Sequence, residues 1–143
     1  METIVQKHCD DAQSFFKKLA LQLGAPEDIQ QAMRLTRAVM HAIRNRITPE
    51  ESMHLVSQHP LLLKGIYIDG WNISQPLSDS RTMDEFLLDL QRTQPRGGTD
   101  FTDIETAKNK IRTVFNALRQ YVDDGEYRHL ITELPKEIAD ALR

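Results

Sequence analysis

The chain has little of what a disulfide-stabilised or membrane-spanning protein needs. Its 143 residues include one cysteine, Cys9, so no intramolecular disulfide can form, and we expect a reducing compartment, the cytoplasm. The most apolar run, Pro60 to Ile68, is interrupted by Lys64 and is far too short to cross a bilayer. We therefore expect a cytoplasmic protein with no membrane partner.

Basic residues are neither in excess nor concentrated. The chain has 18 lysines and arginines against 21 acidic residues, a net charge of −3, and the basic residues are spread along its whole length. Domains that bind nucleic acid usually carry a concentrated basic face. The single triplet Arg96-Gly97-Gly98 is a very weak RNA signal, so we expect no nucleic-acid partner.

Apolar residues recur at three- and four-residue steps, the spacing of one face of an α-helix. No segment alternates with period two, so we expect an all-α protein without strands. Gly24 would end the first helix, and Pro26 would lie in the first turn of the second. We expect capping boxes at Thr48, Thr82 and Thr102. In a capping box, a side chain and a glutamate three residues later cap the helix start.

The second half of the chain repeats the first. A shift of 75 positions places Ala32–Tyr67 over Ala107–Leu142 without a gap, and nine of the 36 pairs are identical, where chance gives roughly two or three. The identical pairs are Ala32/Ala107, Arg37/Arg112, Val39/Val114, Ala42/Ala117, Arg44/Arg119, Glu51/Glu126, His54/His129, Leu55/Leu130 and Pro60/Pro135.

This repetition predicts a helical bundle built from two tandem four-helix units. We expect the first unit at about 3–67, a linker at about 68–81 and the second unit at about 82–143. A unit of about 70 residues buries little surface alone. We therefore expect one domain, 1–143, in which both units share a core about an approximate two-fold axis.

Several runs resemble one bacterial family. They include Arg37-Ala38-Val39, Pro49-Glu50-Glu51, His54-Leu55, Leu134-Pro135-Lys136-Glu137-Ile138 and, most recognisably, Pro60-Leu61-Leu62-Leu63-Lys64-Gly65-Ile66-Tyr67-Ile68-Asp69-Gly70-Trp71. The family is catalogued as domain of unknown function 2267, and the resemblance covers nearly the whole chain. It implies an all-helical bacterial protein and brings no activity, cofactor or catalytic residues.

No residue pattern predicts catalysis or metal binding. The chain has no glycine-rich phosphate loop and no nucleophile elbow. It also lacks paired cysteines or histidines at the spacing typical of zinc sites. Glu51 and Glu126 are explained as capping residues, and Cys9 lies on an apolar stripe that favours inert burial. We expect no enzyme, catalytic residue, metal or cofactor.

Four arginines are the main binding candidates. Arg37 and Arg44, like Arg112 and Arg119, are seven residues apart and share a helix face. Related by the repeat, they could hold an anionic ligand or an acidic partner. Each could instead pair with a carboxylate or cap carbonyl groups at a helix end, and this structural interpretation is favoured.

Tyr67, Asp69 and Trp71 are the remaining candidates, because they lie where the repeat stops. An aromatic pair in a connection can anchor a partner, although it more often packs the linker onto the core. Abundant helix signals without catalytic ones favour a non-enzymatic protein–protein interaction module, whose partner is another protein or a second copy. The alternative is an anion or small-ligand binding domain that uses the arginines between the units.

Overall fold

The computed structural model describes residues 3–94 and 100–143, and within them it is helical with connecting turns and no strand. The prediction of an all-α protein is therefore confirmed. The Arg96-Gly97-Gly98 triplet lies outside the described residues. The helices are α1 (Ile4–Gln22), α2 (Ile29–Arg44), α3 (Pro49–Val56), α4 (Leu61–Ile68), α5 (Met83–Arg92), α6 (Ile104–Leu118), the short 3-10 helix η1 (Arg119–Tyr121), α7 (Asp124–Glu133) and α8 (Lys136–Leu142).

Side-chain oxygens cap most of these helices at their first turn. Thr48 accepts a hydrogen bond from the backbone N–H of Glu51 at α3, and Thr82 accepts the equivalent bond at α5. Two predicted helix starts were wrong. Asp28 caps α2, so Pro26 lies before the helix, and Asp103 rather than Thr102 caps α6. In both cases a carboxylate nearer the helix accepts the free N–H groups.

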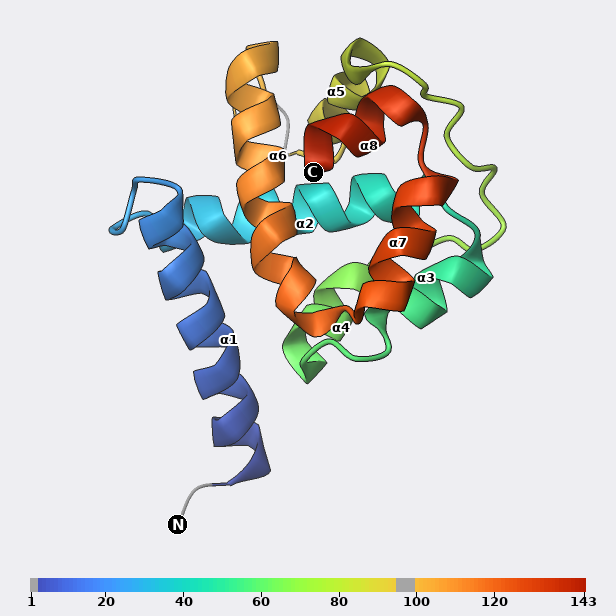
Figure 1. Cartoon of the computed structure of the whole chain (residues 1–143). Helices are drawn as coiled ribbons and strands as arrows, with labels where there is room; N and C mark the ends of the chain where they lie inside the picture. The colour runs from blue at the N-terminus through green and yellow to red at the C-terminus, as the bar shows by residue number, and fades with distance from the viewer. Residues whose placement is uncertain (1–2, 95–99) are drawn as a thin grey trace.

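Helix α2 lies at the centre of the molecule (Figure 1). It contacts α1, α4, α5 and α6, and its residues from Ala38 to Arg44 are all buried. A helix that is buried on every side must be covered by several others. Because of this, α2 joins helices from both halves of the chain into one hydrophobic core.

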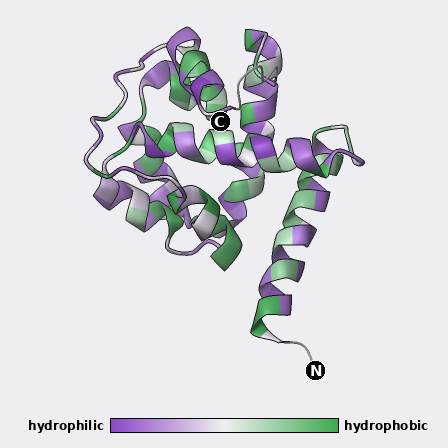
Figure 2. Ribbon diagram, turned by 180° about the vertical axis from the view of Figure 1, so that it is seen from behind, coloured by the Kyte–Doolittle hydropathy of each residue, from purple (hydrophilic) through white to green (hydrophobic). Residues whose placement is uncertain are grey.

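Helix α1 packs on this core only through its second half. Its buried residues begin at Ala12, whereas Ile4 and Val5 are 73% and 68% exposed. Both views of the ribbon show the N-terminal turns of α1 projecting beyond the other helices (Figures 1 and 2). Cys9, expected to be buried, is only partly so, because it lies in this projecting part.

The connection between α4 and α5 is an extended segment fastened to the end of α2. It begins with a tight turn in which Gly70 has a φ of +68°, a conformation that favours glycine. The backbone N–H of Ser78 donates to the carbonyl of Asn45 (2.7 Å), and Arg46 Nε donates to that of Ser80 (2.9 Å).

Among the described helices, none is long and apolar enough to span a membrane.

Candidate functional site

Two of the three arginines of α2, Arg37 and Arg44, hold the end of α4. Arg44 is buried, and its Nη1 donates to the carbonyls of Tyr67 (2.8 Å) and Asp69 (2.9 Å). Arg37 Nη1 lies 2.8 Å from Asp69 Oδ2, and this hydrogen bond lowers the pKa of Asp69 below its usual value. Because the last carbonyl groups of a helix lack partners within it, the contacts of Arg44 cap α4, and Arg37 holds the side chain of the residue that follows the helix.

The two candidate arginines of the second half, Arg112 and Arg119, have different partners. Arg112 Nε donates to the carbonyl of Ala141 in the last turn of α8 (3.2 Å). The guanidinium carbon of Arg119 lies 3.7 Å from the ring centroid of Tyr127 on α7, a cation–π geometry. Arg37 and Arg44 thus share the end of α4, whereas Arg112 and Arg119 contact α8 and α7 separately.

Tyr67 and Trp71 pack together at the end of α4. Tyr67 is buried within the helix, and its hydroxyl group lies 2.7 Å from Ser52 Oγ. Burial raises the pKa of Tyr67 above its usual value. The Trp71 ring, partly buried, meets Tyr67 edge-on and lies under Arg44. Three of the predicted binding residues, Tyr67, Asp69 and Trp71, therefore lie together with Arg37 and Arg44.

A polar hollow of about 340 Å³ lies beside this cluster, between α2, the extended connection and α5. Its lining includes His41, Arg44, Asp89 and Arg92. Nε of Arg44 is buried there without a hydrogen-bond partner. His41 Nε2 donates to the carbonyl of Ile66 (2.6 Å), and burial lowers the pKa of His41, so the ring is neutral near pH 7.

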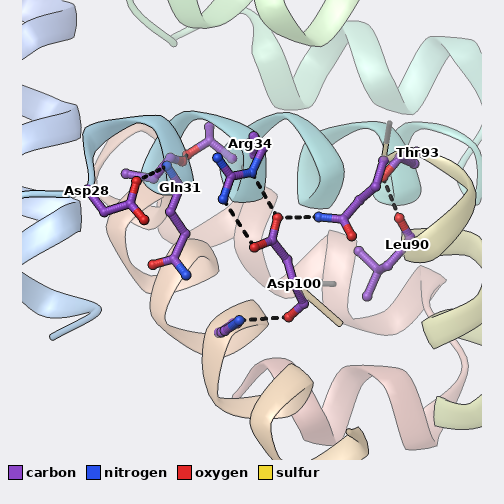
Figure 3. Close-up of polar contacts among 10 residues, drawn as sticks. Asp28, Gln31, Arg34, Leu90, Thr93 and Asp100 are labelled. Carbon is purple, nitrogen blue, oxygen red and sulfur yellow. Dashed lines mark hydrogen bonds and ion pairs between the residues drawn. The ribbon is translucent and has the colours of Figure 1, made fainter. Parts of the chain in front are cut away.

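A second polar cluster surrounds Asp100 and joins α2, α6 and the residues that follow α5 (Figure 3). Arg34 of α2 binds the carboxylate through Nε (3.0 Å) and Nη2 (3.3 Å), and Gln94 donates to the same group. Lys110 of α6 donates to the Asp100 carbonyl (2.7 Å). Because the charged groups of Arg34, Asp100 and Lys110 are all paired, the cluster is accounted for by attaching the start of the segment before α6 to α2.

The short helices α3 and α7 pack against each other, and two glutamates and a histidine meet between them. Glu51 Oε2 lies 2.7 Å from His129 Nε2. Oε1 of Glu51 and Oε1 of Glu126 are both buried, and no N–H or hydroxyl group donates to either. An open hollow of about 580 Å³ over this point is lined by Thr48, Glu50, Glu51, His54, Glu126, His129 and Glu133.

Burial together with the hydrogen bond and charge of Glu51 raises the pKa of Glu126 from 4.5 to about 7. Two carboxylates that share a partly dry site cannot both ionise at their usual pH. The pair therefore retains a proton close to neutral pH. Groups with strongly shifted pKa values cluster at functional sites, although ion pairs with a purely structural role also shift pKa values.

Comparison with protein families gives a match, and it spans the residues of all the clusters described above. Residues 12–141 match the model of the family described as Uncharacterized conserved protein (DUF2267). The chain belongs to this family. The resemblance noted in the sequence is thereby confirmed, and a search of curated proteins found no match.

The DUF2267 match includes the arginines, the end of α4 and the hollow between α3 and α7, since all lie within residues 12–141. The projecting turns of α1 lie before the match. It begins at Ala12, which is also the first buried residue of the helix.

The cluster of Glu51, Glu126 and His129 between α3 and α7 was not predicted from the sequence of this DUF2267 chain, because both glutamates were interpreted as capping residues. The backbone half of that interpretation is confirmed: the N–H groups of Glu51 and Glu126 donate to Thr48 and Asp123. The Glu51 carboxylate, however, contacts His129. A signal was present, since Glu-x-x-His occurs twice, at Glu51-x-x-His54 and Glu126-x-x-His129.

Proposed function

We propose that this DUF2267 chain is a non-enzymatic helical module that binds another protein, in the cytoplasm, where its one cysteine would stay reduced. The observation that carries the proposal is the projecting end of α1. Val5 lies on the same apolar stripe of the helix as Ala12 and Phe16. Ala12 and Phe16 are buried, whereas Val5 and its neighbour Ile4 are exposed. Exposed apolar side chains that continue a buried apolar stripe are typical of a helix that docks in a groove.

The size of this surface favours a partner that surrounds the helix end. Residues 4–11 extend about 12 Å along the helix axis. A standard interface buries about 800 Å² on each partner. Two copies whose helix ends lay side by side would bury less than this area. We therefore propose a different protein with an apolar groove rather than a second copy of this chain.

Affinity purification with a double variant tests this proposal. We expect that the chain carrying Ile4→Asp and Val5→Asp loses a partner that both the unchanged chain and a Gln13→Asp control retain, since Gln13 is exposed on the same helix. Calorimetry with the purified partner must then give the same order of affinities. A partner retained by the double variant, or light scattering that shows an α1-dependent dimer, would overturn it.

A second candidate function is the binding of a small anion in the hollow between α2, the connection and α5. The observation in its favour is the unpaired, buried Nε of Arg44 beside Arg92. Against it, the hollow lies at the C-terminal ends of α2 and α5, where the helix dipoles repel anions. Thermal-shift measurements with phosphate and nucleotides test it, and no shift at about millimolar concentration would count against it.

We also propose that the eight helices are two copies of one four-helix unit. Repeat-related glutamates, Glu51 and Glu126, face each other across α3 and α7, as a two-fold arrangement requires. If the units share one core, a chain ending near Ser80 should not fold. Cooperative unfolding of that fragment would contradict the shared core.

A further inference from the structure

Two Glu-x-x-His pairs face each other across the contact between α3 and α7. Glu51 and His54 lie on α3, and Glu126 and His129 lie on α7, each pair separated by three residues. Residues three apart on a helix lie on the same face. All four residues line the hollow of about 580 Å³, together with Thr48, Glu50 and Glu133.

The carboxylates in this hollow have more acceptor atoms than the surrounding groups have hydrogens to donate to them. The Glu51 side chain is only 10% exposed, its Oε2 contacts His129, and its Oε1 accepts from no N–H or hydroxyl group. Oε1 of Glu126 is buried without an N–H or hydroxyl donor as well, so only a shared proton can join the two carboxyl groups. Buried carboxylate oxygens without donors are unfavourable, so a positive charge between the two carboxylates, either a proton or a metal ion, would stabilise them.

We propose that Glu51, His54, Glu126 and His129 form a binding site for a divalent transition-metal ion such as Zn²⁺. Two carboxylate oxygens and two imidazole nitrogens suit such an ion, whereas Mg²⁺ and Ca²⁺ prefer oxygen ligands alone. Two carboxylates also neutralise its charge. Glu-x-x-His pairs on facing helices are a donor arrangement that helical bundles use for metal ions.

Binding requires one side chain to turn. Within residues 3–94 and 100–143, no three histidine, cysteine or acidic side chains already surround a common point closely enough to hold an ion. His129 contacts Glu51, and His54, which is exposed, acts electrostatically on Glu126. Rotation of His54 toward Glu126 would give the second half of the site the same contact as the first.

Metal binding at this site should release protons. The groups that face Glu126 are Glu51 and His54 from α3 and His129 from its own helix, with Glu50 and Glu133 at the rim of the hollow. An ion that replaces the proton shared by the carboxylates would bind more weakly as the pH falls. Glu133 Oε1 lies 3.8 Å from His129 Nε2, so it can orient that ring.

Titration of the full-length chain with ZnCl₂ by calorimetry tests the site, with MgCl₂ as the control ion. We expect binding of a single Zn²⁺, proton release in buffers of different ionisation enthalpy, and no binding of Mg²⁺. Each of Glu51→Gln, Glu126→Gln, His54→Gln and His129→Gln should weaken Zn²⁺ binding by about ten-fold or more. Circular dichroism checks that every variant is folded.

Two matched controls should bind Zn²⁺ as the unchanged chain does. Glu85→Gln alters the glutamate at the corresponding position of α5, where its carboxylate interacts with Thr82 rather than with the hollow. His8→Ala alters a histidine beside Cys9 on α1. The proposal is overturned if Zn²⁺ does not bind, if His8→Ala abolishes binding, or if binding survives any of the four ligand variants unchanged.

Discussion

Replacing Glu126 by glutamine should make the protein more stable at pH 8 and remove much of its pH dependence. Folding raises the pKa of Glu126 from 4.5 to about 7, so the folded state holds a proton that the unfolded state releases between these values. Stability is therefore lost as the pH rises from about 4.5 through about 7. Glutamine cannot ionise, and it should keep the stability that the wild-type chain has only at low pH.

The magnitude follows from the two pKa values. The difference between 4.5 and about 7, at about 1.4 kcal/mol per unit of pKa, amounts to about 3 kcal/mol. Glu126 is only partly buried, so solvent screens part of the repulsion. We expect the free energy of unfolding of Glu126→Gln to exceed that of the wild-type chain by about 1–2 kcal/mol at pH 8 and to equal it near pH 4.5.

Urea unfolding between pH 4.5 and 8 in the presence of a chelator measures this difference. Glu85→Gln is the matched control, because Glu85 also follows a capping residue by three positions but is exposed; its difference from the wild-type chain should not change over this range. The reasoning is refuted if Glu126→Gln is less stable than the wild-type chain at pH 8, or if the two pH profiles are parallel.

The remaining predictions concern His59 and the two arginines that hold the end of α4. Burial lowers the pKa of His59 to about 4, so its contribution to stability is present above about pH 6.5 and is lost as the pH falls; at pH 5 we expect a loss of about 2 kcal/mol that His59→Phe abolishes in urea unfolding. Arg44→Ala should lower the free energy of unfolding by about 2–3 kcal/mol, because two carbonyls of α4 lose their donor. Arg37→Ala, whose ion pair with Asp69 is exposed, should leave the urea midpoint unchanged, and equal losses in the two arginine variants would contradict this account.

Helix existence and most helix starts could be predicted because their causes are local. Thr48 and Thr82 cap α3 and α5 as expected, since a hydroxyl group and an N–H three residues later are neighbours in any helix start. The start of α2 was predicted too early. Both Pro26 and Asp28 are compatible with a first turn, and only the stronger capping group, Asp28, determines where the helix begins.

The contacts that form the candidate sites could not be predicted, because they depend on which helices pack together. Arg34 and Asp100 are 66 positions apart, and neither belongs to a recognisable motif. Glu51 and His129 meet only because α3 packs against α7. The arginine spacing did indicate a shared helix face, but it could not distinguish an anion site from the capping contacts that Arg44 makes with α4.

The central position of α2 has a consequence for the order in which the chain can fold during synthesis. The ribosome completes α2 long before α5 and α6, two of the four helices that cover it. Until α6 has left the ribosome, apolar residues of α2 such as Val39 and Ile43 lack part of their cover. A nascent chain halted near the connection between α4 and α5 should therefore expose this apolar surface and be a substrate for chaperones.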